Sequence, residues 1–267
     1  MAFPFKFSAG QVPDDLVCLF ESASRDLSSV SATLVLLPGL DGTDVFLRPL
    51  VAALSPAIRP VVVTYPASGA EEYGQALGVV RRATAGLSEF YVLGLSFSGP
   101  LAVMLAAEEP ERVKGVVLVA TFVRLPRPTL RFFRFACTET TLWMWRIARR
   151  IPIWLLRSRR DPLRLAKAET LSRVPARCFA GRTRAVIDVD VSAALRRCRQ
   201  PILCVSFERD MIVPRQNVEA ILRAAPSTTH ATLPGGHFTG CRDAGALAAE
   251  VEAFLARAEA LRPGAPS

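Results

Sequence analysis

The segment of residues 94–99, GLSFSG, has the composition of a turn that presents a nucleophilic serine. It directly follows the apolar run EFYVLGL and directly precedes GPLAVMLAAEE, which has helical character. A sharp strand-to-helix turn needs small residues two positions before and two positions after the nucleophile, because its backbone is strained and neighbouring chain passes close to it. Gly94 and Ser98 meet that requirement, so we expect Ser96 to stand beside a helix N-terminus that favours developing negative charge. The alternative interpretation is that Ser96 only caps the helix.

A nucleophilic serine needs a base, because its hydroxyl is a poor nucleophile at neutral pH. The chain contains two histidines. His237 lies in the loop LPGGHF after the last expected strand, whereas His230 lies inside that strand, where we expect an ordinary strand residue. The imidazole in turn needs a carboxylate to hold its tautomer. Asp210, in the loop SFERDMIVP after the preceding strand, is the first candidate and Glu208 the second, although a loop histidine and a turn aspartate can also be purely structural.

A glycine-rich turn, LLPGLDGTD at residues 36–44, follows an early apolar run. Acyl transfer needs amide donors aimed at the tetrahedral oxyanion, and a glycine-rich turn lets backbone approach a substrate closely. We therefore expect the amides of Leu40 and Phe97 to form an oxyanion hole. A plain strand-to-helix turn, in which Asp41 or Thr43 caps the helix, is compatible with this role.

The elements that must position these residues alternate between strand length and helix length along the chain. This pattern predicts an α/β fold, with a parallel sheet covered on both faces by helices. The expected strands are Leu16–Phe20, Thr33–Leu37, Pro60–Tyr65, Phe90–Leu95, Gly115–Ala120, Ile202–Phe207 and Thr228–Leu233. The expected helices are Asp44–Leu54, Glu71–Gly86, Phe97–Glu108, Asn217–Ala224 and Ala244–Leu261.

The alternation fails between Ala120 and Pro201, where the sequence is rich in arginine and aromatic residues. A long insert of this kind in a regular α/β chain predicts a cap above the strand ends. We expect a hydrolase-like core at residues 1–120 and 200–267 and a helical, basic cap at residues 121–199. Residues 121–190 hold 16 Lys/Arg and 5 Asp/Glu, a net charge of +11, whereas the whole chain carries +9.

The turn around Ser96, the loop with Asp210 and the loop with His237 together resemble an α/β-hydrolase-fold serine hydrolase of the small, capped carboxylesterase branch. The resemblance covers most of the chain outside the cap. It implies a mostly parallel central sheet flanked by helices, with a helical cap inserted after the sixth strand of the fold. It also implies a Ser96/Asp210/His237 triad, an oxyanion hole at Leu40 and Phe97, and neither a cofactor nor a metal. One departure is the sequence LPG at residues 37–39, where many members of the family have His-Gly.

The presence of a serine at position 96 limits the reactions that the chain could catalyse. Members that open epoxides or remove halide are expected to use an aspartate there, so Ser96 argues against those reactions. Members that cleave N-terminal residues from peptides are expected to hold the substrate ammonium with carboxylates of the cap, and the 5 Asp/Glu among 16 Lys/Arg in residues 121–190 argue against that reaction. Carboxylic esters and thioesters remain. An acyltransferase or thioesterase with the same serine is an alternative. A non-catalytic binding protein on the hydrolase fold would be expected to have lost a triad member.

The basic cap suggests a partner. Its plan is similar to that of esterases that release a carrier-bound dicarboxylate, a pimeloyl group, from its methyl ester in biotin synthesis. The hypothesis is that an acidic acyl-carrier protein docks on the cap, with Arg146, Arg149, Arg150 and Trp143 as candidate contacts. The rival hypotheses are a peripheral membrane surface that delivers a lipid ester, or solvated helix faces without a partner. Nucleic acid is not expected, because no motif that reads it accompanies the charge.

Six cysteines are scattered through the chain without a C-x-x-C pair, which is typical of reduced thiols in a cytosol. The first residues, MAFPFKFSAG, lack the apolar stretch of a secretory signal. The nearest approach to a membrane span, residues 142–156, contains three arginines. We therefore expect a cytoplasmic protein.

Overall fold

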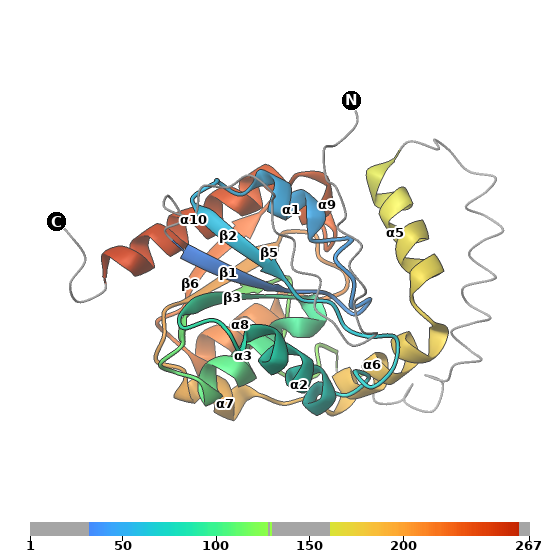
Figure 1. Cartoon of the computed structure of the whole chain (residues 1–267), viewed down its shortest axis with the longest axis horizontal. Helices are drawn as coiled ribbons and strands as arrows, with labels where there is room; N and C mark the ends of the chain where they lie inside the picture. The colour runs from blue at the N-terminus through green and yellow to red at the C-terminus, as the bar shows by residue number, and fades with distance from the viewer. Residues whose placement is uncertain (1–31, 128, 130–160, 262–267) are drawn as a thin grey trace.

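A computed structural model describes residues 32–127, 129 and 161–261 of the 267-residue chain. In this part of the protein the strands form one parallel sheet with the order β2-β1-β3-β4-β5-β6 (Figure 1). The strands are β1 (Ala32–Leu37), β2 (Ile58–Val62), β3 (Phe90–Leu95), β4 (Val113–Val119), β5 (Ile202–Phe207) and β6 (Thr229–Leu233). The strand expected at residues 16–20 lies outside the described residues.

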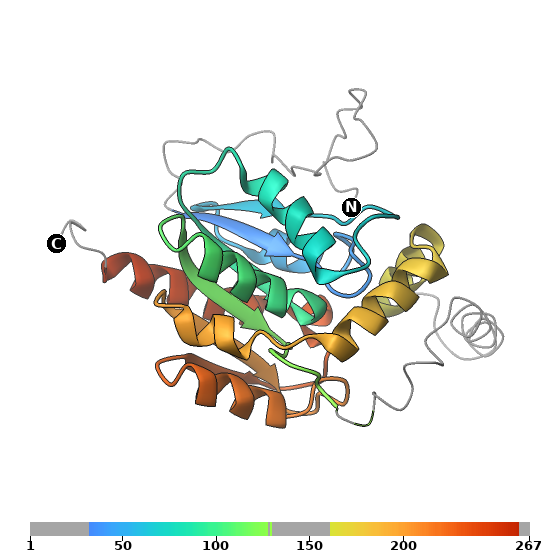
Figure 2. The same ribbon diagram turned by 90° about the horizontal axis from the view of Figure 1, so that it is seen from below.

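Helices cover both faces of the sheet (Figures 1 and 2). One face carries α2 (Tyr73–Thr84), α3 (Gly99–Glu108), α7 (Ser192–Arg197) and α8 (Gln216–Ala224). The other carries α1 (Arg48–Ala53), α9 (Thr239–Arg242) and α10 (Ala244–Ala260). The nearly continuous apolar runs of β3 and β4 follow from this arrangement, because a strand buried on both faces has no solvent side for polar residues.

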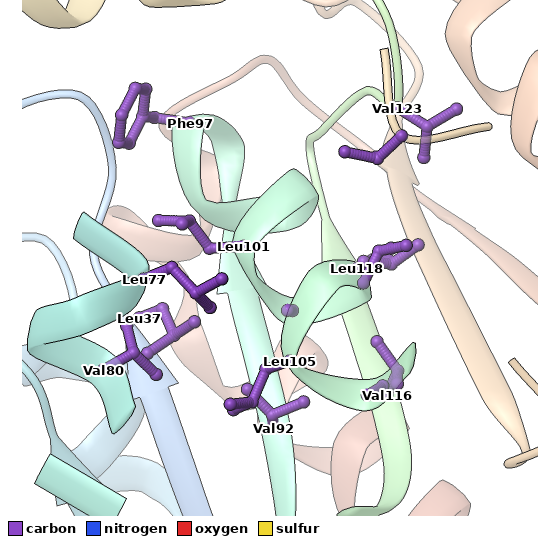
Figure 3. Packing of buried hydrophobic residues seen from close by; sticks show 14 of the residues in the cluster. Leu37, Leu77, Val80, Val92, Phe97, Leu101, Leu105, Val116, Leu118 and Val123 are labelled. Carbon is purple, nitrogen blue, oxygen red and sulfur yellow. The ribbon is translucent and has the colours of Figure 1, made fainter. Parts of the chain in front are cut away.

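The helix that follows Ser96 is packed firmly on the middle of the sheet. Leu101 and Leu105 of α3 are fully buried and lie over Val92 of β3 and Val116 of β4 (Figure 3). A side chain of this size contributes about 1.5–3 kcal/mol when it is removed from water. The packing therefore fixes the direction in which the chain leaves β3.

Two further helices, α5 (Pro162–Arg173) and α6 (Ala176–Asp188), lie beyond one end of the sheet (Figure 1). Helix α5 begins where the side chain of Asp161 accepts a hydrogen bond of 3.1 Å from the Leu163 amide, with Pro162 in the first turn. Helix α6 reaches the turn after β1, since Arg182 donates to the Leu40 carbonyl. Both helices are thus at the carboxyl ends of the strands.

The insert that contains these helices begins after β4, the fourth of the described strands. The expected cap range of residues 121–199 includes α7, yet Leu195 of α7 is fully buried in the cluster that packs on the sheet. Residues 192–197 therefore belong to the helical layer over the sheet. Residues 130–160 lie outside the described residues, and with them Trp143, Arg146, Arg149 and Arg150.

Several element boundaries differ from the sequence-based expectation for local reasons. Helix α1 begins at Arg48 and not at Asp44, because the preceding residues form a turn in which the Leu47 amide donates to the Asp44 carbonyl. Strand β2 begins at Ile58 and ends at Val62, whereas the expected strand ran from Pro60 to Tyr65. Pro60 therefore lies inside the strand, which is tolerated because β2 is at the edge of the described sheet. Among the described helices, none combines the length and apolarity needed to cross a bilayer.

Candidate active site

The structure brings Ser96, His237 and Asp210 together at the carboxyl ends of three strands. Ser96 follows β3, Asp210 follows β5 and His237 follows β6. The Nδ1 of His237 lies 2.7 Å from Oδ2 of Asp210, and its Nε2 lies 3.0 Å from Oγ of Ser96. With Asp210 ionised, Nδ1 carries the proton that the carboxylate accepts, and Nε2 is then free to accept the proton of the Ser96 hydroxyl.

The backbone at Ser96 is strained. Its φ is 51°, in the left-handed region that non-glycine residues seldom adopt. The hydroxyl of Thr121 donates to the Ser96 carbonyl and holds the turn from the side of β4. Ser96 opens a short 3-10 turn, η2 (Ser96–Ser98), which continues into α3. The sharp turn lifts the hydroxyl clear of the strand and toward His237.

Gly94 is needed for that turn because the chain folds back against it. A Cβ on Gly94 would overlap the carbonyl oxygen of Ser98 and lie 2.8 Å from Cα of Gly99. The requirement for a small residue two positions before the nucleophile is therefore a matter of space, not of backbone conformation.

Asp210 is held by its own loop. Its Oδ1 accepts hydrogen bonds of 2.8 Å from the amides of Ile212 and Val213, which leaves Oδ2 for His237. Only 4% of the Asp210 side chain is exposed to solvent. The second carboxylate candidate, Glu208, is exposed and makes no hydrogen bond to His237 within the described structure.

His230 lies elsewhere. It is exposed on β6, where its Nε2 lies 2.9 Å from Oγ of Ser206 on β5. Thr232 lies beside the same pair, 3.4 Å from the imidazole. The structure therefore places only one of the two histidines at Ser96.

The two residues of the expected oxyanion hole, Leu40 and Phe97, belong to one hydrophobic cluster beside Ser96. Phe97 follows Ser96 directly at the start of η2, and Leu40 lies in the turn after β1 and lines the same pocket as Ser96. Tyr73 stacks on the Phe97 ring with a centroid separation of 4.7 Å and donates a 3.1 Å hydrogen bond to the Phe97 carbonyl. The orientation of the two amides toward a substrate stays a prediction.

Ser98, which stands where many serine hydrolases have glycine, links the two halves of this region. Its hydroxyl donates to the Pro38 carbonyl in the turn after β1. The hydroxyl of Tyr65 lies 2.6 Å from the Ser98 oxygen and donates to it. Burial raises the pKa of Tyr65 and of Tyr73 above the usual value, so both phenols stay protonated and remain donors. Nothing in the sequence pattern pointed to these tyrosines.

Neither Asp41 nor Thr43 caps the following helix, because α1 begins at Arg48 and no side chain of the described residues caps its N-terminus. Asp41 instead stabilises its own turn. Its carboxylate accepts hydrogen bonds from the amide and the hydroxyl of Thr43, the amide at 3.0 Å. Burial raises the pKa of Asp41, since water is excluded from the ionised form. The bonds to Thr43 act in the opposite direction and stabilise the turn that contains Leu40.

Ser96 and His237 open into a cavity of about 500 Å³ that extends toward α1, α9 and α10 and is covered by α5 and α6. Most of the side chains around it are apolar: Leu40, Phe46, Leu47, Leu50, Leu93, Leu95, Val119, Leu171, Phe179, Phe207, Ile212, Phe238, Cys241 and Leu247. Asp41 and Lys167 are the charged residues of the lining. Thr170 of α5 also lines it, and its buried hydroxyl has no hydrogen-bond partner within the described structure. The described residues contain no group of three His, Cys, Asp or Glu side chains that could hold a metal.

The model of the alpha/beta hydrolase family matches residues 34–250, which include all three of these residues. The chain belongs to the alpha/beta hydrolase family. A comparison with curated proteins finds no match.

Solved structures with the same fold include the enol-lactonase from Burkholderia xenovorans LB400, which is 21% identical over 86% of this chain and 94% of that chain, with a TM-score of 0.73. An esterase from Exiguobacterium antarcticum is 14% identical over 85% of this chain and 92% of that chain, with a TM-score of 0.69. A bromoperoxidase from Bacillus anthracis is 15% identical over 84% of this chain and 91% of that chain, with a TM-score of 0.68. At these identities the likeness establishes the fold.

The turn before Ser96 can be tested by adding one methyl group. Gly94→Ala is expected to lower the free energy of unfolding by about 1–3 kcal/mol, because the new Cβ has no space and Ser98 must move. Gly74→Ala is the matched control: Gly74 is exposed in α2, a Cβ there meets no atom within 4 Å, and the change should raise helix stability by up to about 1 kcal/mol. Urea unfolding of both variants measures the difference, and equal midpoints would contradict the close packing at Gly94.

Proposed function

We propose that this alpha/beta hydrolase is a serine hydrolase that cleaves a carboxylic ester through an acyl-enzyme. The observation that carries the proposal is the continuous hydrogen-bond chain from Asp210 through His237 to Ser96, which ends in an apolar pocket. A nucleophile, a base in reach of it and a third group that orients the base are the combination that covalent acyl transfer requires.

The steps follow from this geometry. As the Ser96 oxygen attacks the ester carbonyl, Nε2 of His237 takes the serine proton, and negative charge develops on the former carbonyl oxygen. The amides of Leu40 and Phe97 would bind that oxyanion. When the C–O bond to the leaving group breaks, His237 returns the proton to the departing alcohol, and the acyl group remains on Ser96. Water then attacks the acyl-enzyme with His237 again as the base, which releases the acid and restores the serine.

The pocket supports an apolar group as the part of the substrate that is bound. Its lining offers few polar partners, so a charged or strongly hydrated group would lose its water there without replacement. The names of two structures with the same fold, an enol-lactonase and an esterase, are consistent with ester cleavage, since a lactone is a cyclic ester.

The delivery of the acyl group is a further part of the proposal. The strongly basic segment of residues 121–190 favours an acidic acyl-carrier protein as the donor, with a carrier-bound methyl ester as the substrate. A membrane surface and a free ester are the alternatives, and an acyltransferase or thioesterase would use the same serine with a different acceptor or leaving group.

The assignment of the nucleophile is tested with two serine variants. Ser96→Ala is expected to lower kcat on a short p-nitrophenyl ester by roughly 10⁶-fold, because the acyl-enzyme no longer forms. Ser206→Ala is the matched control: Ser206 also lies 2.9 Å from a histidine, but it is on the sheet surface, and its loss should leave kcat unchanged. Activity that survives in Ser96→Ala would overturn the proposal. A wild-type enzyme that forms the acyl-enzyme but passes the acyl group only to an added alcohol would indicate a transferase.

The position of the acyl group is tested by narrowing the pocket. Leu247→Phe is expected to reduce kcat/KM for octanoyl esters by about tenfold or more relative to acetyl esters, since a filled pocket excludes the longer chain. Leu261→Phe makes the same substitution at the residue that follows α10, which is 81% exposed, and should leave the ratio unchanged. If Leu247→Phe leaves the octanoyl-to-acetyl ratio intact, the acyl chain does not lie in this cavity.

The carrier is tested by comparing one acyl ester free and attached to an acyl-carrier protein. Arg149→Glu with Arg150→Glu is expected to lower kcat/KM for the carrier-bound ester by at least tenfold at low salt and to leave the free ester unaffected, because the carrier is acidic. Arg223→Glu with Arg257→Glu, at two exposed positions of α8 and α10, makes the same change in net charge outside the basic segment and is the control. Equal rates on both substrates in the wild type would show that the basic segment does not dock a carrier.

A further inference from the structure

Arg182 of α6 is the largest side chain that the described structure buries completely, with 1% of its surface exposed. A buried guanidinium is costly unless its N–H groups find acceptors. Arg182 donates to backbone carbonyls: Nη1 to Asp41 at 2.7 Å and to Leu40 at 3.2 Å, Nη2 to Pro66 at 3.2 Å, and Nε to Ala70 at 3.1 Å. The planar fork of five N–H donors suits this set of acceptors.

These carbonyls belong to two loops at the carboxyl end of the sheet. Leu40 and Asp41 lie in the turn after β1, which supplies one of the two expected oxyanion donors, and Pro66 and Ala70 lie in the loop after β2. The guanidinium also lies over the ring of Tyr65, 5.4 Å from its centroid. One side chain of the inserted segment therefore joins both loops next to the nucleophile.

The turn is shaped around the guanidinium. Gly42 has a φ of +73°, and a Cβ on it would lie 2.8 Å from Cζ of Arg182 and overlap Nη1. Helix α6 also packs closely against the loop after β2, where a Cβ on Gly181 would lie 2.6 Å from Cβ of Glu71. Helix α6 is thus seated against both loops with no space for one more methyl group.

Leu40 is consequently held from both directions along the chain. Two residues before it, the Pro38 carbonyl accepts a hydrogen bond from Ser98. At Leu40 itself and at Asp41, the carbonyls accept from Arg182. The peptide groups on either side of the Leu40 amide are therefore restrained, and so is the direction of that N–H.

We propose that Arg182 is a positioning residue for the reaction: it fixes the turn after β1 so that the Leu40 amide points at the oxyanion. The inserted segment then takes part in transition-state stabilisation through α6, in addition to covering the pocket. This inference rests on the proposed function.

The experiment replaces Arg182 by lysine, which keeps the positive charge but can reach fewer of the four carbonyls. Arg182→Lys is expected to lower kcat by roughly 10²-fold, the usual loss of one oxyanion donor, and to change KM by less than about threefold, because the oxyanion exists only in the transition state. A trifluoromethyl ketone, which forms a tetrahedral adduct with the nucleophilic serine, should lose affinity by about the same factor as kcat/KM.

Arg112→Lys is the control that distinguishes a positioning role of Arg182 from a contribution to stability alone. Arg112 also donates to backbone carbonyls, those of Thr84 and Leu87, and lies 5.6 Å from the centroid of Phe90, but it precedes β4 at the opposite end of the sheet. We expect this variant to lose stability and to keep its kcat per folded molecule. If Arg182→Lys behaves in the same way, with the ketone bound as tightly as in the wild type, Arg182 has only a structural role and the inference is overturned.

A second variant keeps the test decisive if Arg182→Lys fails to fold. Gly181→Ala leaves the turn after β1 unaltered, but its Cβ would lie 2.6 Å from Cβ of Glu71, so α6 must shift and carry Arg182 with it. This variant should lower kcat and weaken ketone binding in parallel, with KM little changed. If Arg182→Lys folds, the two changes in one chain should cost no more than the larger single change, because they disturb the same contact. Full kcat in Gly181→Ala, or additive losses in the double variant, would contradict the role of Arg182.

The proposed function can fail separately from this inference. A wild-type enzyme without Ser96-dependent ester hydrolysis would overturn the proposed function. An active wild type together with an Arg182→Lys variant of unchanged kcat would overturn only the positioning role.

Discussion

The structure around the site depends on one strained turn, the left-handed backbone of Ser96 between β3 and α3. Strain of this kind costs of order 1–3 kcal/mol and persists only where the surroundings leave the chain no alternative. Here the packing of Leu101 and Leu105 on the sheet fixes the axis of α3, while the hydrogen bonds within the sheet fix the end of β3. The chain must connect the two over a few residues, and Ser96 takes the unfavourable conformation that the connection requires.

Polar side chains behind the turn hold it in that conformation. Tyr65 donates to Ser98, and Ser98 donates to the Pro38 carbonyl, so a buried chain of hydroxyl groups links the turn at Ser96 to the turn after β1. Every hydroxyl in this chain has a partner, which is the condition under which a buried polar network stabilises a single arrangement. Many members of the family are expected to have His-Gly where this chain has Pro38-Gly39, and here Ser98 supports the turn through the Pro38 carbonyl.

Much of this could be predicted from the sequence, because the signals involved are local. The apolar runs identified the described strands, and the small residues at Gly94 and Ser98 identified the turn at Ser96. The proximity of His237 and Asp210 to Ser96 could be predicted from the topology of the sheet. The carboxyl ends of parallel strands lie at one edge of the sheet, so the loops after β3, β5 and β6 converge there.

Arg182 could not be found in that way. It is one of 33 Lys and Arg residues, in a segment whose net positive charge suggested solvent or a partner, and its acceptors are main-chain carbonyls that carry no sequence signature. The roles of Tyr65 and Tyr73 could not be predicted for the same reason. Their hydrogen-bond partners are set only by the packing of loops that lie far apart in the chain.

The chain contains two serine–histidine pairs with nearly the same separation, 3.0 Å for Ser96 with His237 and 2.9 Å for Ser206 with His230. Distance therefore does not distinguish a nucleophile from a surface hydrogen bond. The first pair has a buried carboxylate behind the imidazole, a strained backbone that exposes the hydroxyl, and a cavity in front of it. The second has a threonine as its neighbour and lies in solvent on the sheet. In the proposed mechanism, the groups around a serine–histidine pair decide whether it can react, because they set the tautomer of the histidine and stabilise charge on it.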